Sequence, residues 1–244
     1  MRSFFDDYPR FFETSDVGAW PIRLALRHHA VIETNRHLLE GARVLDLASH
    51  DGRWSLAALK AGAAHVTGIE ARERLVSASR ENMIAYGMHA SSYTFLIGDL
   101  NHATQAPVNC DVALCLGYFY HTLNHLALMQ YLASTKAQHL VLDGMVEPSE
   151  GDIIRVYAEE TDSEANGITN SGIFDGKILV GHPTVSVLVK MLDHYGYDSA
   201  VFDWSQLLTE RGIIADKTKS HGQDNPVGDY ARGARATIRA SRRA

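Results

Sequence analysis

The sequence has few cysteines and no long hydrophobic run, and each shortage narrows what the protein can be. Cys110 and Cys115 are the two cysteines among 244 residues. We expect both in one strand, an odd number of residues apart, so their side chains point to opposite faces and do not pair. No secretory pattern opens the sequence, and no apolar run is long enough to span a membrane. Together these features predict a protein of the reducing cytoplasm.

An excess of positive charge is also missing. Lysine and arginine total 23 against 29 aspartate and glutamate residues, which gives a formal net charge of -6. This balance favours neither nucleic acid nor an anionic membrane as a partner. The C-terminal arginines Arg235 and Arg239 share one face of a predicted last strand, where charge resists aggregation. A small molecule is therefore the expected partner, and a homodimer stays an alternative to a monomer.

Apolar residues are plentiful enough for a full core, at 45% of the chain. We predict an N-terminal helical cover over residues 1–40 and a main domain over 41–244, with an acidic insertion around 158–182. The cover includes a helix over 22–39 and is rich in aromatic residues. Burial against the core is the simpler interpretation of these aromatics. The alternative is a lid that excludes water from a reacting centre.

Residues 43–70 organise the rest of the chain. The apolar run Val44 to Leu47 predicts a buried strand, and the turn Ala48 to Gly52 leads into a helix over 54–61. A second strand over 65–69 ends at Glu70. Small residues after the first strand let a nucleoside approach the backbone, and an acid about 20 residues past the turn can accept hydrogen bonds from ribose.

This unit resembles motif I and the ribose acid of the class I, Rossmann-like methyltransferases that use S-adenosylmethionine, whose usual motif is D-x-G-x-G-x-G. The run from Asp46 to Gly52 keeps the last glycine of that motif, with Ala48 and His50 at the other two glycine positions. Histidine adds a Cβ there, although it adopts left-handed backbone more readily than most residues. The turn lacks the Lys-Ser/Thr of a P-loop and the glycine spacing of a dinucleotide site, which favours S-adenosylmethionine.

The resemblance covers roughly Leu39 to Trp204 and implies an α/β fold. We expect a seven-stranded, mostly parallel, doubly wound sheet with helices on both faces and an antiparallel last strand. The remaining strands are predicted over 92–97, 110–117, 139–143, 199–204 and 234–240, with a short strand over 153–157. Helices are predicted over 71–85, 123–134 and 185–194, and a polar loop over 216–230.

A second motif follows the predicted fourth strand. Leu116 and Gly117 precede Tyr118-Phe119-Tyr120-His121. This resembles the L-G-x-x-Y-H box of the methyltransferase group that includes the tRNA wobble-uridine carboxymethyl-transferring enzymes. The resemblance also gives Asp99 a contact with the adenine amino group, and a turn-capping aspartate is the alternative. The residues expected around S-adenosylmethionine are Asp46, Ala48, Ser49, His50, Gly52, Glu70, Ala71, Gly98, Asp99, Leu100, Leu116, Gly117 and Tyr118.

The expected catalytic residues are His121, Tyr120 and Asp143. His121 would act as a base toward an acceptor hydroxyl or would orient the substrate by a hydrogen bond. The Tyr120 ring would attract a sulfonium or shape the acceptor pocket, and Asp143 and His182 are second choices as bases. His121 and His125 have the spacing of a metal-binding pair, but without further ligands in the pattern we predict no metal site.

The expected function is methyl transfer from S-adenosylmethionine to an oxygen or nitrogen of a small molecule. In such an in-line displacement the protein mainly orients the reacting atoms. A tRNA-modifying transferase and a non-catalytic cofactor-binding protein are the alternatives.

Overall fold

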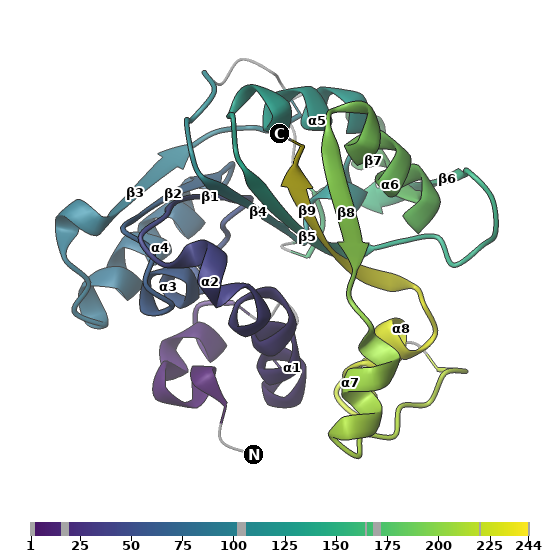
Figure 1. The fold of residues 1–244 in the computed structure, drawn as a ribbon, viewed down its shortest axis with the longest axis horizontal. Helices are drawn as coiled ribbons and strands as arrows, with labels where there is room; N and C mark the ends of the chain where they lie inside the picture. Colours follow the sequence, from purple (N-terminus) through teal and green to yellow (C-terminus); the bar gives the residue numbers. More distant parts are fainter. Residues whose placement is uncertain are drawn as a thin grey trace.

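A seven-stranded sheet forms the centre of the computed structural model, which describes residues 3–15, 20–101, 106–163, 165–167, 172–219 and 221–243 (Figure 1). The strand order is β3-β2-β1-β4-β5-β9-β8. Neighbours among β1 to β5 pair in parallel, and β9 pairs antiparallel with both β5 and β8. The strands are β1 (Arg43–Leu47), β2 (His65–Glu70), β3 (Tyr93–Ile97), β4 (Val112–Leu116), β5 (His139–Met145), β8 (Tyr197–Val201) and β9 (Arg235–Arg242). The predicted fold class is confirmed.

Helices cover both faces of this sheet, because successive residues of its strands point to opposite sides. Val44 packs in a core with residues of α3 (Arg53–Lys60) and α4 (Glu73–Ala85). Its neighbour Leu45 packs in the opposite core with α5 (His125–Ser134) and α6 (Val185–His194). The apolar run of β1 is therefore buried on both sides, as its sequence predicts.

The N-terminal residues pack on the α3 side of the sheet. The 3-10 helices η1 (Phe4–Asp7) and η2 (Pro9–Phe12) contribute Phe5 and Phe11, both fully buried, and the Phe5 ring lies 5.4 Å from that of Trp54. Burial, the simpler interpretation of the aromatic residues, holds for Phe5 and Phe11.

The predicted continuous helix over 22–39 is wrong. It is divided into α1 (Pro21–Val31), η3 (Glu33–Asn35) and α2 (Arg36–Leu39). The buried amide of Asn35 donates to the carbonyl oxygens of Ala30 and Val31, at 3.3 and 3.2 Å. A side chain that bonds its own backbone in this way competes with helical hydrogen bonds and favours a break.

The segment after β5 also differs from the prediction. Instead of one short strand and an acidic insertion, it forms a hairpin of β6 (Ile154–Glu160) and β7 (Lys177–Pro183). Glu164 and residues 168–171 of the expected insertion lie outside the described residues. The last part of the predicted strand over 199–204 is wrong as well, since Asp203 accepts a hydrogen bond from the Gln206 amide and starts α7 (Trp204–Glu210).

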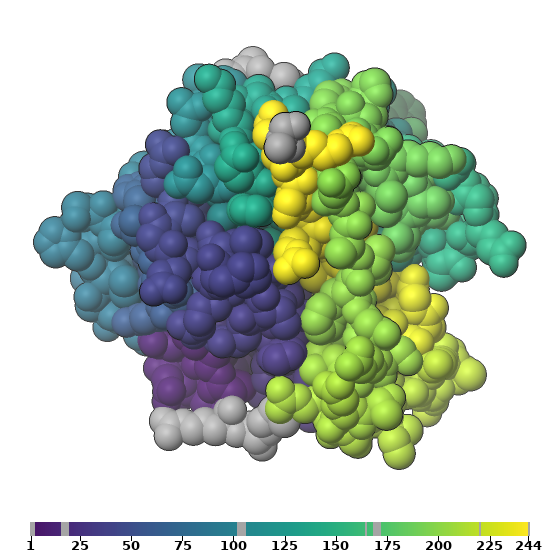
Figure 2. All heavy atoms as spheres, viewed as in Figure 1, coloured from purple at the N-terminus to yellow at the C-terminus, as the bar shows by residue number. Residues whose placement is uncertain are grey.

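Residues 26–30 pack against residues 204–230, and the surfaces of these two parts of the chain adjoin in Figure 2. Leu26 of α1 packs with Trp204 of α7 and with Tyr230 of α8 (Gly228–Ala231), a short helix within the predicted polar loop. The remaining elements are η4 (Ala90–Ser92) and η5 (Phe119–His121). No helix in the described ranges is long and apolar enough to cross a membrane. The two cysteines are buried free thiols.

Gly68 in β2 offers a test of this packing. An alanine Cβ at Gly68 would lie 2.5 Å from Phe95 Cδ1 and 2.7 Å from Ser49 Oγ, whereas one at Gly222 would meet nothing within 4 Å. Overpacking of a buried site typically costs about 1–3 kcal/mol. We expect urea unfolding to show a loss of about that size for Gly68→Ala and a much smaller change for Gly222→Ala. Equal losses would contradict the close approach of β2 to β3 and the turn.

Candidate functional site

A cavity of about 720 Å³ lies at the carboxyl ends of the parallel strands, the edge at which open α/β sheets bind ligands. Its volume falls within the range of small-molecule sites. Ten of the thirteen residues expected around the cofactor line it: Ala48, His50, Glu70, Ala71, Gly98, Asp99, Leu100, Leu116, Gly117 and Tyr118. The topology therefore brings together residues from the ends of four strands.

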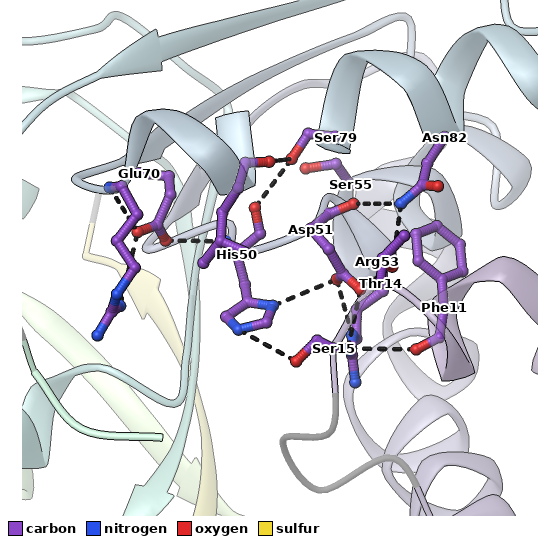
Figure 3. Close-up of polar contacts among 12 residues, drawn as sticks. Phe11, Thr14, Ser15, His50, Asp51, Arg53, Ser55, Glu70, Ser79 and Asn82 are labelled. Atoms are coloured by element: carbon purple, nitrogen blue, oxygen red, sulfur yellow. Dashed lines mark hydrogen bonds and ion pairs between the residues drawn. The ribbon is translucent and has the colours of Figure 1, made fainter. Parts of the chain in front are cut away.

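The turn after β1 adopts left-handed backbone at three positions. The φ angles are +52° at Ala48, +53° at His50 and +81° at Gly52. The His50 side chain extends toward the N-terminal segment, with Nε2 3.3 Å from Ser15 Oγ and Nδ1 3.5 Å from Asp51 Oδ1 (Figure 3). A histidine can thus replace a motif glycine here while its amide still faces the end of β2.

Asp51 links this turn to the N-terminal segment. Its fully buried carboxylate accepts hydrogen bonds from Thr14 Oγ1 at 2.8 Å and from Arg53 Nε and Nη2 at 2.9 Å (Figure 3). Burial alone would raise the pKa of Asp51, but Arg53 and His50 beside it hold that pKa well below its usual value. The sequence interpretation gave Asp51 and Arg53 no role, although the Asp-x-Arg spacing after the turn was a usable signal.

Glu70 is held by the backbone at the end of β2. Its Oε2 accepts from the His50 amide at 3.1 Å, and its Oε1 accepts from the Arg72 amide at 3.0 Å. The carboxylate is buried yet lines the cavity. At the end of β3, Asp99 also lines the cavity and accepts from the Asn101 amide at 2.9 Å. Asp99 therefore makes the turn contact that was the alternative to an adenine contact, while it still faces the cavity.

Tyr120 and His121 lie in η5, just after β4, and both line the cavity. His121 Nδ1 lies 2.7 Å from Glu159 Oε2 of β6, and the Tyr120 ring lies 4.0 Å from that of His121. His182 of β7 lies 5.6 Å from Tyr120, and burial lowers its pKa. The β6–β7 hairpin thus supplies Glu159, whose part in the site the sequence interpretation missed because strand pairing delivers it.

The structure contradicts a direct catalytic role for Asp143. Its carboxylate is fully buried and is not among the residues that line the cavity. It accepts hydrogen bonds from Arg27 at 2.8 Å, Arg235 at 2.7 Å, Tyr230 at 2.7 Å and Thr237 at 2.6 Å. Burial alone would raise the pKa of Asp143, but the two guanidinium groups hold it well below its usual value. Asp143 instead positions Arg27 and Arg235, which do line the cavity.

Three residues expected around the cofactor do not line the cavity: Asp46, Ser49 and Gly52. They support the residues that do, rather than contacting a ligand directly. Asp46 accepts a 2.6 Å hydrogen bond from Ser55, and a Cβ on Gly52 would lie 3.1 Å from that of Ser79. Within the described residues, no group of three His, Cys, Asp or Glu side chains is arranged to hold a metal ion.

Comparisons with known proteins agree with this architecture. Residues 44–138 match the family described as "Methyltransferase domain". Ribosomal protein L11 methyltransferase from Stenotrophomonas maltophilia (strain K279a) is 32% identical over 122 residues, which are 50% of this chain but 38% of that protein. The match therefore spans well under half the length of this relative.

Two solved structures share the fold. The N-terminal domain of EvdMO1 with SAH bound has a TM-score of 0.62 and 17% identity, covering 96% of this chain and 84% of that one. Magnesium protoporphyrin IX methyltransferase from Synechocystis PCC 6803 with bound SAH has a TM-score of 0.58 and 17% identity, covering 98% and 94%. Residues 44–138 therefore resemble a methyltransferase domain, and the chain shares the fold of these two solved structures.

Asp46 makes the stability of this site depend on pH. Burial, aided by the charges of Glu70 and Asp51 and opposed by the Ser55 hydrogen bond, raises the pKa of Asp46 to about 7. The protonated carboxyl suits the folded state, so the contribution of Asp46 to stability is full below its unfolded pKa near 4 and is lost as pH rises through about 7. We compare the free energy of unfolding of Asp46→Asn with that of the unmodified protein at each pH. We expect this difference to favour the mutant by about 2–4 kcal/mol more at pH 8 than at pH 5.

Urea unfolding at pH 5, 6.5 and 8 measures this difference. Asp198→Asn is the matched control, because the Asp198 side chain is 77% exposed. A gain for Asp46→Asn that does not change with pH would contradict the raised pKa.

Proposed function

We propose that this chain is a methyltransferase that transfers the methyl group of S-adenosylmethionine to an oxygen or nitrogen of a small-molecule acceptor. The observation that carries the proposal is one shared cavity, in which Glu70 and Asp99 of neighbouring strand ends face the same space as Tyr120 and His121. The match of residues 44–138 to a methyltransferase domain, and the bound SAH named for structures of the same fold, support it.

The residues present fit this cofactor. Both oxygens of Glu70 already accept backbone hydrogen bonds, which fixes a carboxylate in the cavity wall where it would accept from ribose hydroxyls. Asp99 would accept from the adenine amino group, and Ala71 and Gly98 leave room beside these acids. Tyr118 also lines the cavity, and its buried hydroxyl has no hydrogen-bond partner within the described part of the chain.

When bound, S-adenosylmethionine supplies a methyl group on a cationic sulfur, whose S–C bond breaks and returns its electron pair to sulfur as the acceptor lone pair forms the new bond. The residues of the chain orient the acceptor and manage its proton. When the Nδ1–H group of His121 donates a hydrogen bond to Glu159, Nε2 of the neutral ring is left free to take the proton of a substrate hydroxyl. The Tyr120 ring beside it offers a π face to positive charge.

Removal of the Glu70 charge tests cofactor binding. We expect Glu70→Gln to weaken binding of S-adenosylmethionine by about 10- to 100-fold in calorimetry, because a charge-assisted hydrogen bond becomes a neutral one. Glu73→Gln, a surface change three residues away, should bind like the unmodified protein. An unmodified protein that does not bind S-adenosylmethionine would overturn the proposal, and binding without turnover of any acceptor would favour a non-catalytic protein.

Replacement of His121 tests proton transfer. For a hydroxyl acceptor found by screening, we expect His121→Gln to lower kcat by about 10²- to 10⁴-fold, while affinity for S-adenosylmethionine changes little. The control is His89→Gln, at an exposed histidine that is not among the residues lining the cavity. Glu159→Gln should give a smaller loss of kcat and shift the pH profile, since Glu159 holds the His121 tautomer. Unchanged turnover in His121→Gln would remove this residue from the chemistry.

A further inference from the structure

We propose that Arg23, Arg27 and Arg235 form an anion subsite in the cavity, and that the methyl acceptor carries a carboxylate that binds there. This inference rests on the proposed function and names the class of its acceptor.

The subsite holds one more positive charge than its buried partners neutralise. The three arginines line the cavity but are only 3%, 8% and 7% exposed. Arg27 and Arg235 pair with Asp143, and Arg23 pairs with Asp229. Among the described residues, these three guanidinium groups face two carboxylates, which leaves one positive charge without a partner in the network. Because an unbalanced buried charge is costly, an anionic ligand would stabilise this arrangement.

Arg27 also has an unused hydrogen-bond donor. Its Nη2 donates to Asp143 at 2.8 Å, while its buried Nε has no partner within the described part of the chain. The guanidinium carbon lies 5.0 Å from the centre of the Trp54 ring, which holds the group in place. A guanidinium that is fixed by packing and contacts a single carboxylate among the described residues is suited to bind a second carboxylate.

The subsite adjoins the residues proposed for methyl transfer. The Arg235 guanidinium carbon lies 5.6 Å from the centre of the Tyr120 ring, and its Nη2 lies 4.0 Å from where a Cβ on Gly117 would be. Glu70 ends β2 and Asp99 follows β3, whereas Arg235 belongs to β9, on the other side of β4 in the sheet. Arg235 thus lies across the sheet from Glu70 and Asp99, beside Tyr120.

The surrounding side chains indicate the rest of the ligand. Trp20, Trp54 and Tyr120 line the cavity beside the arginines, which suits a flat or aromatic body. The single excess charge matches a carboxylate more closely than a dianionic phosphate. The acceptor class is therefore an aromatic carboxylate with a hydroxyl or amino group as nucleophile.

Matched ligands test this inference. The probes are hydroxy- and amino-substituted benzoates, each paired with its neutral primary amide, and binding is measured by calorimetry on the full chain with S-adenosylhomocysteine present. We expect at least one acid to bind at least tenfold more tightly than its amide. Arg27→Met should abolish that preference, whereas the surface change Arg36→Met should preserve it. A panel in which no acid exceeds its amide by threefold would overturn the subsite.

A second comparison separates the acceptor from the cofactor, which carries a carboxylate of its own. S-adenosylhomocysteine is compared with 5′-methylthioadenosine, which lacks the amino-acid carboxylate, in the unmodified protein and in Arg27→Met. A loss confined to S-adenosylhomocysteine would assign Arg27 to the cofactor and overturn the acceptor subsite. Binding of neither nucleoside by the unmodified protein would defeat the proposed function itself. Arg27→Met leaves two arginines facing two carboxylates, so circular dichroism should show a folded chain.

Discussion

The buried carboxylate of Asp143 is the contact on which the cavity depends. It binds Arg27 from α1, Arg235 and Thr237 from β9, and Tyr230 from α8. Asp143 therefore joins the sheet to α1 and α8. Removal of the Asp143 carboxylate would leave the buried guanidinium groups of Arg27 and Arg235 without their shared partner, and such uncompensated buried charge is strongly destabilising. Asp143 therefore both joins these elements and holds the guanidinium groups of Arg27 and Arg235 at the cavity wall.

A second polar network, centred on Asp51, fixes the turn after β1 beside the cavity. Asp51 connects Thr14 of the N-terminal segment to the turn after β1, and the His50 amide of that turn holds Glu70. The turn that replaces two motif glycines is thus supported from both sides. Left-handed backbone at Ala48 and His50 would otherwise cost free energy, and the surrounding contacts compensate for that strain.

Local patterns in the sequence were sufficient to predict the parallel strands and the residues at their carboxyl ends. Local sequence alone predicts the position of three features: the apolar run of β1, the acid at Glu70 and the box that ends at His121. The break at Asn35 and the β6–β7 hairpin were missed because a side-chain hydrogen bond and a pairing across a polar insertion decide them. The place of Asp143 was misjudged for the same reason, since its partners lie up to 116 residues away.

The position of β9 has a consequence for how the chain folds. Residues 235–242 occupy an interior place between β5 and β8, and residues 139–145 of β5 pair with them across nearly a hundred residues of sequence. During synthesis, one edge of β5 therefore stays unpaired until residues 235–242 have left the ribosome. Non-local pairing of this kind slows folding and exposes a strand edge to aggregation. Until β9 is inserted, β5 and β8 each present an open edge on which a strand of another molecule could pair.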